Sequence, residues 1–304
     1  MTHLRGQIIR AQSGFYTVMS ENGPVTCRLR GRLKRGPRLG DVAAVGDWVR
    51  FSCTAPSHGM IEEIEPRSHM ISRMDPSPRG EYQQIIIANP DQVVFIFACT
   101  QPDPRPGMLD RFLVIAEKQG LPAIVVANKI DLVGIDQVKE AFEHYRSIGY
   151  PVEYTSVKSG IGIDSLRKRL TGKISLFAGP SGVGKTSLLN SIQPGLGLLV
   201  REISQATHKG RHTTLVRQMF PLDVGGYIAD TPGLRALGLW DIEPEELDGY
   251  FPELRTLVDQ CQFNNCTHLH EPGCAVKAAI ASGKVHPSRY QSYTRMRSGE
   301  REYY

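Results

Sequence analysis

The sequence lacks any long hydrophobic run, although 40% of its 304 residues are hydrophobic. Its longest apolar stretches, such as VVFIFAC at residues 93–99, fall far short of the ~20 residues that a membrane-spanning helix needs. The opening residues MTHLRGQIIRAQ contain no apolar core of a signal peptide. We therefore expect a cytoplasmic protein with no membrane segment.

A strong charge of one sign is also missing, because 36 Lys and Arg against 31 Asp and Glu leave a net charge of only +5. The basic residues are unevenly spread, and residues 28–38, RLRGRLKRGPR, hold six of them without an acid. Such a run suits a phosphate-rich partner; the alternative is a solvated loop.

Cysteine is scarce, and three of the six residues are scattered at Cys27, Cys53 and Cys99. The other three lie close together with a histidine, as Cys261, Cys266, His268 and Cys274. In a reducing cytosol, this crowding favours metal ligation over disulfides. Three cysteines and one histidine within fourteen residues predict a tetrahedral structural Zn²⁺ site, and a cluster of reactive thiols is the alternative.

Chain length predicts two or three domains, because 304 residues exceed what one hydrophobic core usually supports. Residues 1–72 contain five short strand-like segments: GQIIRAQ, FYTVMS, VTCRLRG, DWVRFSC and GMIEEIE. Five such strands fit a small OB-type barrel, a fold that commonly binds nucleic acid. A barrel with a purely structural role is the alternative.

From about residue 84 the pattern changes to buried strands that alternate with amphipathic helices. QVVFIFACT, AIVVANKID, PVEYTSVKSG and ISLFAGPSG are each followed by a helical segment, and two hairpin-like strands, TLVRQMF and GGYIADTPG, come after them. This alternation predicts an α/β domain with a mostly parallel sheet and ligands at the carboxyl ends of its strands. Beyond about residue 237 the chain becomes helical and acidic before the cysteine cluster.

The segment GPSGVGKTS matches the phosphate-binding pattern GxxxxGK[ST] between a predicted strand and a predicted helix. Glycines let successive N–H groups face the phosphates at a helix N-terminus, where the helix dipole favours negative charge. Lys185 adds positive charge at the β- and γ-phosphates, and the Thr186 hydroxyl ligates Mg²⁺, so both are predicted catalytic residues. The predicted phosphate loop comprises Gly179, Pro180, Ser181, Gly182, Val183, Gly184, Lys185, Thr186 and Ser187.

NKID, at residues 128–131, predicts that the base is guanine. The Asp131 carboxylate matches the two adjacent donors of guanine, which adenine lacks. Asn128 links the base to the phosphate loop, and the Lys129 stem lies over the ring. Downstream, TSVKSG predicts that Ser156 and Val157 offer backbone N–H groups to the guanine carbonyl, and that Lys158 closes the pocket.

DTPG at residues 230–233 completes the predicted triphosphate side. Asp230 holds Mg²⁺, and the Gly233 N–H senses the γ-phosphate. Upstream, Thr213 or Thr214 of HKGRHTTLV completes the Mg²⁺ shell. The base motif therefore precedes the phosphate loop, which reverses the usual order in GTPases.

These motifs in this order resemble the RsgA/YjeQ family, the circularly permuted, small-ribosomal-subunit-dependent GTPases of bacteria. The resemblance covers essentially the whole chain: the barrel, NKID, SVK, GPSGVGKTS, GRHTT, DTPG and C-x4-C-x-H-x5-C. It implies an OB-type RNA-binding barrel at residues 1–72, a circularly permuted P-loop GTPase domain at 73–236, and a C-terminal α-helical zinc module at 237–304. It also implies hydrolysis of GTP to GDP in late maturation of the small (30S) ribosomal subunit, with that subunit and its 16S rRNA as partners. We expect a monomer.

The residue directly after the DTPG glycine is Leu234. Ras-like enzymes have a glutamine at this position, and that glutamine orients the attacking water. Leucine cannot hydrogen-bond water, so another group is needed or turnover is very slow. The nearest candidate is His212 in GRHTT, and the family resemblance assigns this role to a histidine at the same motif. A surface-loop histidine is the alternative.

Because of the permutation, the phosphate-sensing DTPG loop leads directly along the chain into the zinc module. We expect that a movement of this loop on loss of the γ-phosphate can be passed to whatever the zinc module contacts. We further expect chelation to unfold the C-terminal region while guanine binding is retained. Two rival functions stay open: a GTP-gated RNA-binding module in which hydrolysis is incidental, and a nucleotide enzyme of other chemistry, such as a kinase.

Overall fold

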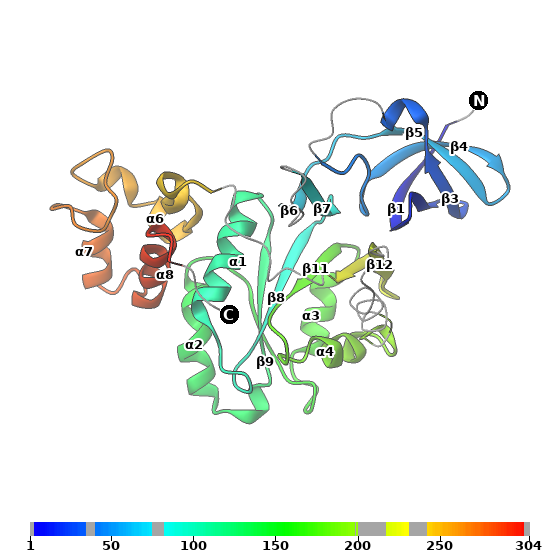
Figure 1. Cartoon of the computed structure of the whole chain (residues 1–304). Helices are drawn as coiled ribbons and strands as arrows, with labels where there is room; N and C mark the ends of the chain where they lie inside the picture. Colours follow the sequence, from blue (N-terminus) through cyan, green and yellow to red (C-terminus); the bar gives the residue numbers. More distant parts are fainter. Residues whose placement is uncertain are drawn as a thin grey trace. The chain divides into compact units, whose positions relative to one another are not determined.

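The computed structural model describes residues 3–34, 40–74, 82–197, 199, 217–230 and 242–300. The chain forms two compact units. The first unit comprises residues 1–93, 163–178 and 185–238, and the second comprises residues 94–162, 179–184 and 239–304. Each unit is therefore assembled from segments that lie far apart in the sequence, as the colours of Figure 1 show.

The first unit begins with the predicted barrel. Its strands are β1 (Leu4–Gln12), β2 (Phe15–Ser20), β3 (Gly23–Leu29), β4 (Trp48–Ala55) and β5 (His58–Ile64), with a short 3₁₀ helix, η1 (Gly31–Lys34), after β3. They pair in the order β1-β2-β3-β5-β4, and a β1–β4 pairing closes the barrel. Inward-facing residues are fully buried, namely Ile8, Val18, Cys27, Phe51 and Ile61. All five predicted strands are therefore confirmed.

Strand β1 also pairs with a strand that follows it by about 200 residues. Its N-terminal half pairs with β4, whereas Arg10 and Ala11 pair antiparallel with Gln218 and Arg217 of β12 (Arg217–Pro221). Strand β12 pairs antiparallel with β13 (Tyr227–Asp230), which pairs in parallel with β11 (Ile174–Ala178). The barrel thus shares a continuous sheet with part of the α/β region, which no local sequence pattern predicts.

Arg217 strengthens this junction through an ion pair with Asp41, at 2.9 Å between Nη1 and Oδ2. The same Asp41 carboxylate accepts hydrogen bonds from the Tyr82 hydroxyl and the Ile85 N–H. Ile85 belongs to an unpredicted hairpin of β6 (Met70–Met74) and β7 (Gln83–Ala88). The first unit is completed by α3 (Ile163–Leu170) and α4 (Lys185–Ile192).

The second unit contains the other half of the α/β region. Strands β10 (Val152–Thr155), β9 (Ala123–Asn128) and β8 (Gln92–Ala98) lie in that order, and β9 and β10 are parallel. Helices α1 (Pro106–Lys118) and α2 (Ile135–Ser147) accompany them, with a short 3₁₀ helix, η2 (Ile130–Leu132), between β9 and α2. The rings of Phe95 in β8 and Phe112 in α1 stack at 5.4 Å. These elements lie where the alternating sequence pattern predicts them.

The C-terminal region of the second unit is helical, as predicted. It contains η4 (Pro244–Tyr250), α6 (Pro252–Arg255), η5 (Val258–Gln260), α7 (Ala275–Ala281) and α8 (Pro287–Arg297). Its hydrophobic cluster includes Phe251, Leu254, Val276 and Tyr293, together with Val114 from α1. No helix among the described residues is long and apolar enough to cross a membrane.

A buried charge network joins α8 to α1, which lie side by side in Figure 1. Arg289 is only 1% exposed, and its guanidinium donates to Asp110 at 2.8 Å and to Glu253 at 2.6 Å. Tyr145 also donates to Asp110, and the guanidinium lies 4.4 Å from the centroid of the Phe251 ring. The C-terminal helix is therefore fixed to the α/β part of the unit by charges that are shielded from water.

Arg289→Ala is expected to lower the free energy of unfolding by about 3–5 kcal/mol, because it leaves two buried carboxylates without their cation. Urea unfolding of the full chain measures this effect. Arg295→Ala is the matched control: Arg295 lies on the same helix but is 47% exposed, so a change below about 1 kcal/mol is expected. Equal losses for the two variants would contradict the buried-network interpretation.

Candidate nucleotide site and metal centre

The phosphate-loop residues 179–184 connect β11 to α4 in the chain, as predicted. Gly179 lies so close to β8 that an added Cβ would stand 2.1 Å from the Ile96 carbonyl oxygen. Gly184 has a φ of +92°, and an added Cβ would stand 2.7 Å from the Asn128 side-chain nitrogen. Both glycines of the motif are thus required for steric reasons that do not depend on a ligand.

Asn128 is the side chain that holds the phosphate loop against the NKID segment. It ends β9, is 1% exposed, and donates from Nδ2 to the Val183 carbonyl oxygen at 2.8 Å. Its Oδ1 accepts a hydrogen bond from the Thr155 hydroxyl at 2.9 Å. Both ends of the amide are therefore engaged, and segments separated by 55 residues are held together.

Lys129 makes a second connection to the same loop. Its backbone has a φ of +65°, which directs the chain sharply away from β9. Its ammonium group donates to the carbonyl oxygens of Gly182, at 2.7 Å, and of Gln101. Lys129 and Asn128 together hold residues 182–183 by hydrogen bonds within the protein.

The Asp131 side chain is exposed and is oriented by Ser156. The Ser156 hydroxyl donates to Asp131 Oδ1 at 2.6 Å, and Ser156 itself is fully buried. The Ser156 N–H, which the sequence assigns to guanine, instead donates to the Ile161 carbonyl oxygen at 3.0 Å and closes the turn. Ser156 therefore contacts the predicted guanine site through its hydroxyl, which donates to Asp131. On the same turn, Val157 is half-buried and Lys158 is exposed.

The remaining residues of the predicted nucleotide site differ in how exposed they are and in whether the structure describes them. Pro180, Lys185 and Thr186 are half-buried, Ser181 and Ser187 are exposed, and Asp230 is the last residue of β13. Because Asp230 pairs with Phe177 of β11, the carboxyl ends of these two parallel strands lie together, as expected for a ligand-binding edge. His212, Thr213, Thr214, Gly233 and Leu234 lie outside the described residues.

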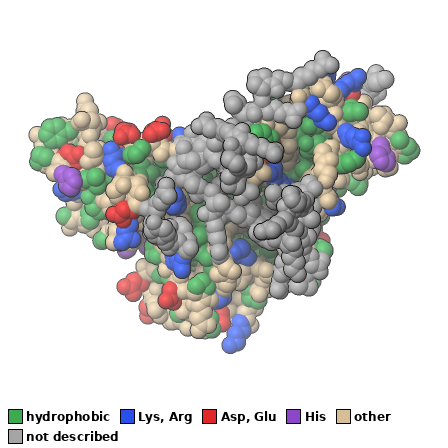
Figure 2. Space-filling view, viewed as in Figure 1, with side chains coloured by type: hydrophobic (Ala, Val, Ile, Leu, Met, Phe, Trp, Pro, Cys, Tyr) green, Lys and Arg blue, Asp and Glu red, His purple; other side chains and the backbone are tan. Residues whose placement is uncertain are grey.

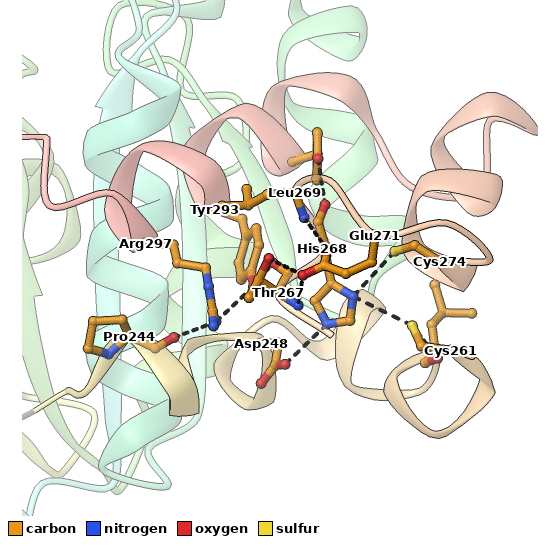
Figure 3. A network of polar contacts seen from close by, with 12 residues as sticks. Pro244, Asp248, Cys261, Thr267, His268, Leu269, Glu271, Cys274, Tyr293 and Arg297 are labelled. Atoms are coloured by element: carbon orange, nitrogen blue, oxygen red, sulfur yellow. Dashed lines mark hydrogen bonds and ion pairs between the residues drawn. The ribbon is translucent and has the colours of Figure 1, made fainter. Parts of the chain in front are cut away.

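The four predicted zinc ligands converge in the C-terminal region. Figure 3 shows three of them, Cys261, His268 and Cys274, with the imidazole ring facing the two sulfur atoms. The candidate ligand atoms of Cys261, Cys266, His268 and Cys274 all lie within 4.8 Å of one another. His268 Nδ1 faces the sulfur atoms, at 3.6 Å from Cys261 and 3.4 Å from Cys274. Three sulfurs and one imidazole nitrogen at this spacing fit a tetrahedral zinc ion.

Asp248 supports the cluster from outside and was not predicted. Its Oδ2 lies 3.1 Å from His268 Nε2, the ring nitrogen that points away from the sulfurs. A carboxylate in this place accepts a hydrogen bond from the Nε2–H group, which leaves the unprotonated Nδ1 as the metal-binding atom. Asp248 lies 20 residues before His268 in η4, so no short motif could have identified it.

Glu271 holds the loop that carries His268. Its carboxylate accepts hydrogen bonds from the hydroxyl and N–H of Thr267 and from the N–H groups of Leu269 and His270. The hydrogen bonds from Thr267 hold the pKa of the Glu271 carboxyl well below its ordinary value. The Tyr290 hydroxyl, from α8, also donates to the His268 carbonyl oxygen at 2.7 Å. The cluster is therefore anchored to α8 as well as to η4.

Comparison with known proteins identifies the family. The family model described as RsgA GTPase matches residues 64–240, and the RsgA N-terminal domain matches residues 5–61. The chain belongs to the RsgA GTPase family. The RsgA resemblance stated from the motifs is thereby confirmed.

RsgA relatives match over nearly their whole length. The Small ribosomal subunit biogenesis GTPase RsgA of Gemmatimonas aurantiaca is 44% identical, with 97% of each chain covered. The protein of the same name from Moorella thermoacetica is 41% identical, with 95% of each chain covered.

Solved RsgA-type structures agree with the fold. The crystal structure of YjeQ from Thermotoga maritima matches with a TM-score of 0.80 at 35% identity, covering 99% of this chain and 100% of that one. YloQ, described as a circularly permuted GTPase, matches with a TM-score of 0.73 at 32% identity, covering 100% of this chain and 98% of that one. The permuted GTPase fold, with a five-stranded N-terminal barrel, is confirmed. Membership of this family makes the protein a GTP hydrolase and implies GTP, GDP and Mg²⁺ as its ligands.

Proposed function

We propose that this protein hydrolyses GTP to GDP and phosphate during late maturation of the small ribosomal subunit, and that the subunit stimulates hydrolysis. The observation that carries the proposal is the buried Asn128 amide, which connects the guanine-recognition segment to the phosphate loop. The names of the RsgA relatives support the ribosomal role. Such a role places the protein in the cytoplasm, with 16S rRNA as a direct partner, and we propose that it acts as a monomer.

The nucleotide is held by residues with separate tasks. Backbone N–H groups of Gly179 and of residues 181–184, together with the Lys185 ammonium, bind the phosphates, and Asp131 selects guanine. Thr186, Asp230 and either Thr213 or Thr214 hold Mg²⁺, which neutralises charge on the phosphates when it is bound. Val157 and Lys158 border the base, and Gly233 contacts the γ-phosphate. The division into residues 1–72, 73–236 and 237–304 remains part of this proposal.

His212 is proposed to orient the attacking water, because Leu234 cannot do so. His212→Ala is expected to slow single-turnover GTP hydrolysis by about 100-fold or more when small subunits are present. GTP affinity is expected to stay within about threefold, since the imidazole acts on water rather than on the nucleotide. Quenched-flow measurement of phosphate release gives the hydrolysis rate, and equilibrium titration with a fluorescent GTP analogue gives the affinity.

His270→Ala is a suitable control, because this exposed histidine lies beside the zinc cluster and far along the chain from GRHTT. A His212→Ala rate equal to that of the unmodified protein, with subunits present, would remove the assignment.

Leu234 also favours a second candidate function, a GTP-gated RNA-binding module in which hydrolysis is incidental. Multiple-turnover hydrolysis that rises with added small subunits would exclude that alternative.

Zinc is proposed as a single structural ion held by Cys261, Cys266, His268 and Cys274. All four positions are filled by protein ligands, so no coordination site is left for catalysis. The ion would stabilise a region whose hydrophobic cluster is small and is shared with α1.

A further inference from the structure

Two histidines outside the nucleotide site and the zinc cluster contact each other within the second unit. His144 belongs to α2, and His286 is the residue directly before the first turn of α8. Their imidazole rings stack, with the centroids 4.1 Å apart and an angle of 13° between the ring planes. This histidine pair therefore joins two helices that lie far apart in the sequence.

His286 also caps α8. Its Nδ1 accepts a hydrogen bond from the Ser288 N–H, at 3.3 Å. An accepting Nδ1 carries no proton, so the neutral ring has its proton on Nε2. A second proton would stand on Nδ1 against the Ser288 N–H and would place positive charge at a helix N-terminus, where the dipole disfavours it. The cap of α8 therefore requires a neutral His286.

His144 lies in surroundings that also favour a neutral ring. Both of its ring nitrogens are buried, and neither has a hydrogen-bond partner within the described part of the chain. The centroid of the Tyr145 ring lies 4.0 Å from that of His144. Burial, with smaller contributions from His286 and Arg289, lowers the pKa of His144 to about 4. A proton on this ring would put a charge into a packed contact that offers it no acceptor.

The charged groups around the pair come from three helices. Asp110 of α1 and Glu253 of α6 are both bound to Arg289 of α8, at 2.8 Å and 2.6 Å. Acidic and basic side chains are interspersed over the C-terminal region on the face shown in Figure 2, at the left of the view, so the surface there has no single sign of charge. The charged group that acts on His144 is thus a cation, Arg289.

We propose that the histidine pair is an acid-sensitive contact, which holds the start of α8 against α2 while both rings are neutral and releases it when either ring is protonated. A histidine in water takes up its proton near pH 6.5, whereas His144 in the packed contact resists protonation. The contribution of the pair to docking is therefore complete above about pH 6.5 and falls as the pH drops from there toward about 4. Attachment of the C-terminal region would thus depend on pH.

Two other origins of acid sensitivity have to be separated from the histidine pair. The Asp110 carboxyl is fully buried, and burial raises its pKa, so its protonation would also alter the Arg289 network. Zinc binding also weakens in acid, because its ligands take up protons. An effect of Asp110 would persist when the histidines are replaced. An effect of zinc loss would reach α7, which begins directly after the ligand Cys274.

The experiment follows hydrogen exchange of the full-length, zinc-loaded protein by mass spectrometry at about pH 7.5 and about pH 5.5, with labelling times scaled to the intrinsic exchange rate. After this scaling, the amides at the start of α8 are expected to exchange about tenfold faster at the lower pH. The reason is that a released histidine is then about ten times more often charged than neutral. The amides of α7 are expected to change less than about twofold, because zinc stays bound.

Replacement of the rings tests the assignment. His144→Phe keeps a stacked ring that takes up no proton, and His286→Asn keeps a side-chain oxygen that can cap α8. The acid effect at α8 is expected to fall below about threefold in His144→Phe and below about twofold in the double variant. His58→Gln is the control, because His58 is an exposed histidine on the barrel, and it should keep the full effect.

An acid effect below about twofold at α8 in the unmodified protein would overturn the proposal. An equal increase in α7 would assign the effect to zinc, and a full effect in the double variant would assign it to Asp110; both results contradict the proposal. A pair that only packs the helices would make the variants less stable at both pH values without changing their pH dependence. His286→Asn serves as a separate variant if His144→Phe does not fold, as judged by circular dichroism at neutral pH.

Discussion

Asp131→Asn is expected to reduce the preference for GTP over ATP by about 100- to 10 000-fold. In the proposed site, the aspartate carboxylate offers only acceptors to the two adjacent guanine donors, and each charge-assisted hydrogen bond contributes about 1.5–3 kcal/mol. Asparagine replaces one acceptor by a donor, so one guanine contact becomes a clash of two donors. Xanthine carries a carbonyl where guanine has its 2-amino group, and xanthosine triphosphate is therefore expected to bind the variant better than GTP.

Competition of GTP, ATP and xanthosine triphosphate against a fluorescent guanine nucleotide measures this change. Ser156→Ala is the graded control, because it removes only the hydroxyl that donates to Asp131 at 2.6 Å. Ser156→Ala is expected to reduce the preference for GTP over ATP about fivefold, because one ordinary hydrogen bond contributes about 1 kcal/mol. If the Asp131→Asn variant kept its guanine preference, the base pocket would have to lie elsewhere.

Removal of zinc is expected to unfold residues 242–300, since structural zinc contributes an apparent ~10–16 kcal/mol to small modules. The buried network adds a second consequence, because unfolding would strip Asp110 in α1 of its Arg289 partner. We therefore expect a lower melting temperature for the rest of the second unit, residues 94–162 and 179–184, as well. Guanine nucleotide affinity is expected to survive, because the bonds of Asn128, Lys129 and Asp131 use no residue of the C-terminal region.

Hydrogen exchange read by mass spectrometry, before and after chelation, resolves these regions separately. Cys274→Ser should reproduce the effect of chelation, and Cys53→Ser should not, because Cys53 is an exposed cysteine on the barrel.

Asp248→Asn should weaken zinc binding by about 10- to 100-fold without abolishing it, as expected for a group that only orients a ligand. Protection of residues 242–300 that persists without zinc, or loss of guanine binding on chelation, would contradict the assignment.

Conformational coupling through the zinc region remains a mechanical inference from chain order. The DTPG loop is followed directly by the segment that leads to η4, and η4 carries Asp248. The contacts of Arg289 with Asp110 and Glu253 add a connection that chain order does not reveal, from α8 back to α1. We propose that movement of the DTPG loop on loss of the γ-phosphate reaches the C-terminal region along the chain. The Arg289–Asp110 contact would be a second connection, between that region and α1.

The sequence by itself determined the features that rest on local patterns. Barrel strands follow from residues that alternate over a few positions, and the α/β elements follow from apolar runs separated by turns. The phosphate loop, NKID and the zinc ligands are short motifs whose spacing reflects one loop or one ion. Their order along the chain was sufficient to identify a permuted GTPase and its family.

Only the tertiary structure decided which distant residues support those motifs. Asp248 orients His268, Arg289 meets Asp110 across 179 residues, and β1 pairs with β12. The use of the Ser156 N–H by Ile161 likewise depends on how one turn closes. These contacts leave no periodic or spaced signal. A buried charge is paired by whichever side chain the fold brings to it, and a strand edge or a turn is paired by whichever backbone group lies beside it, from any distance along the sequence.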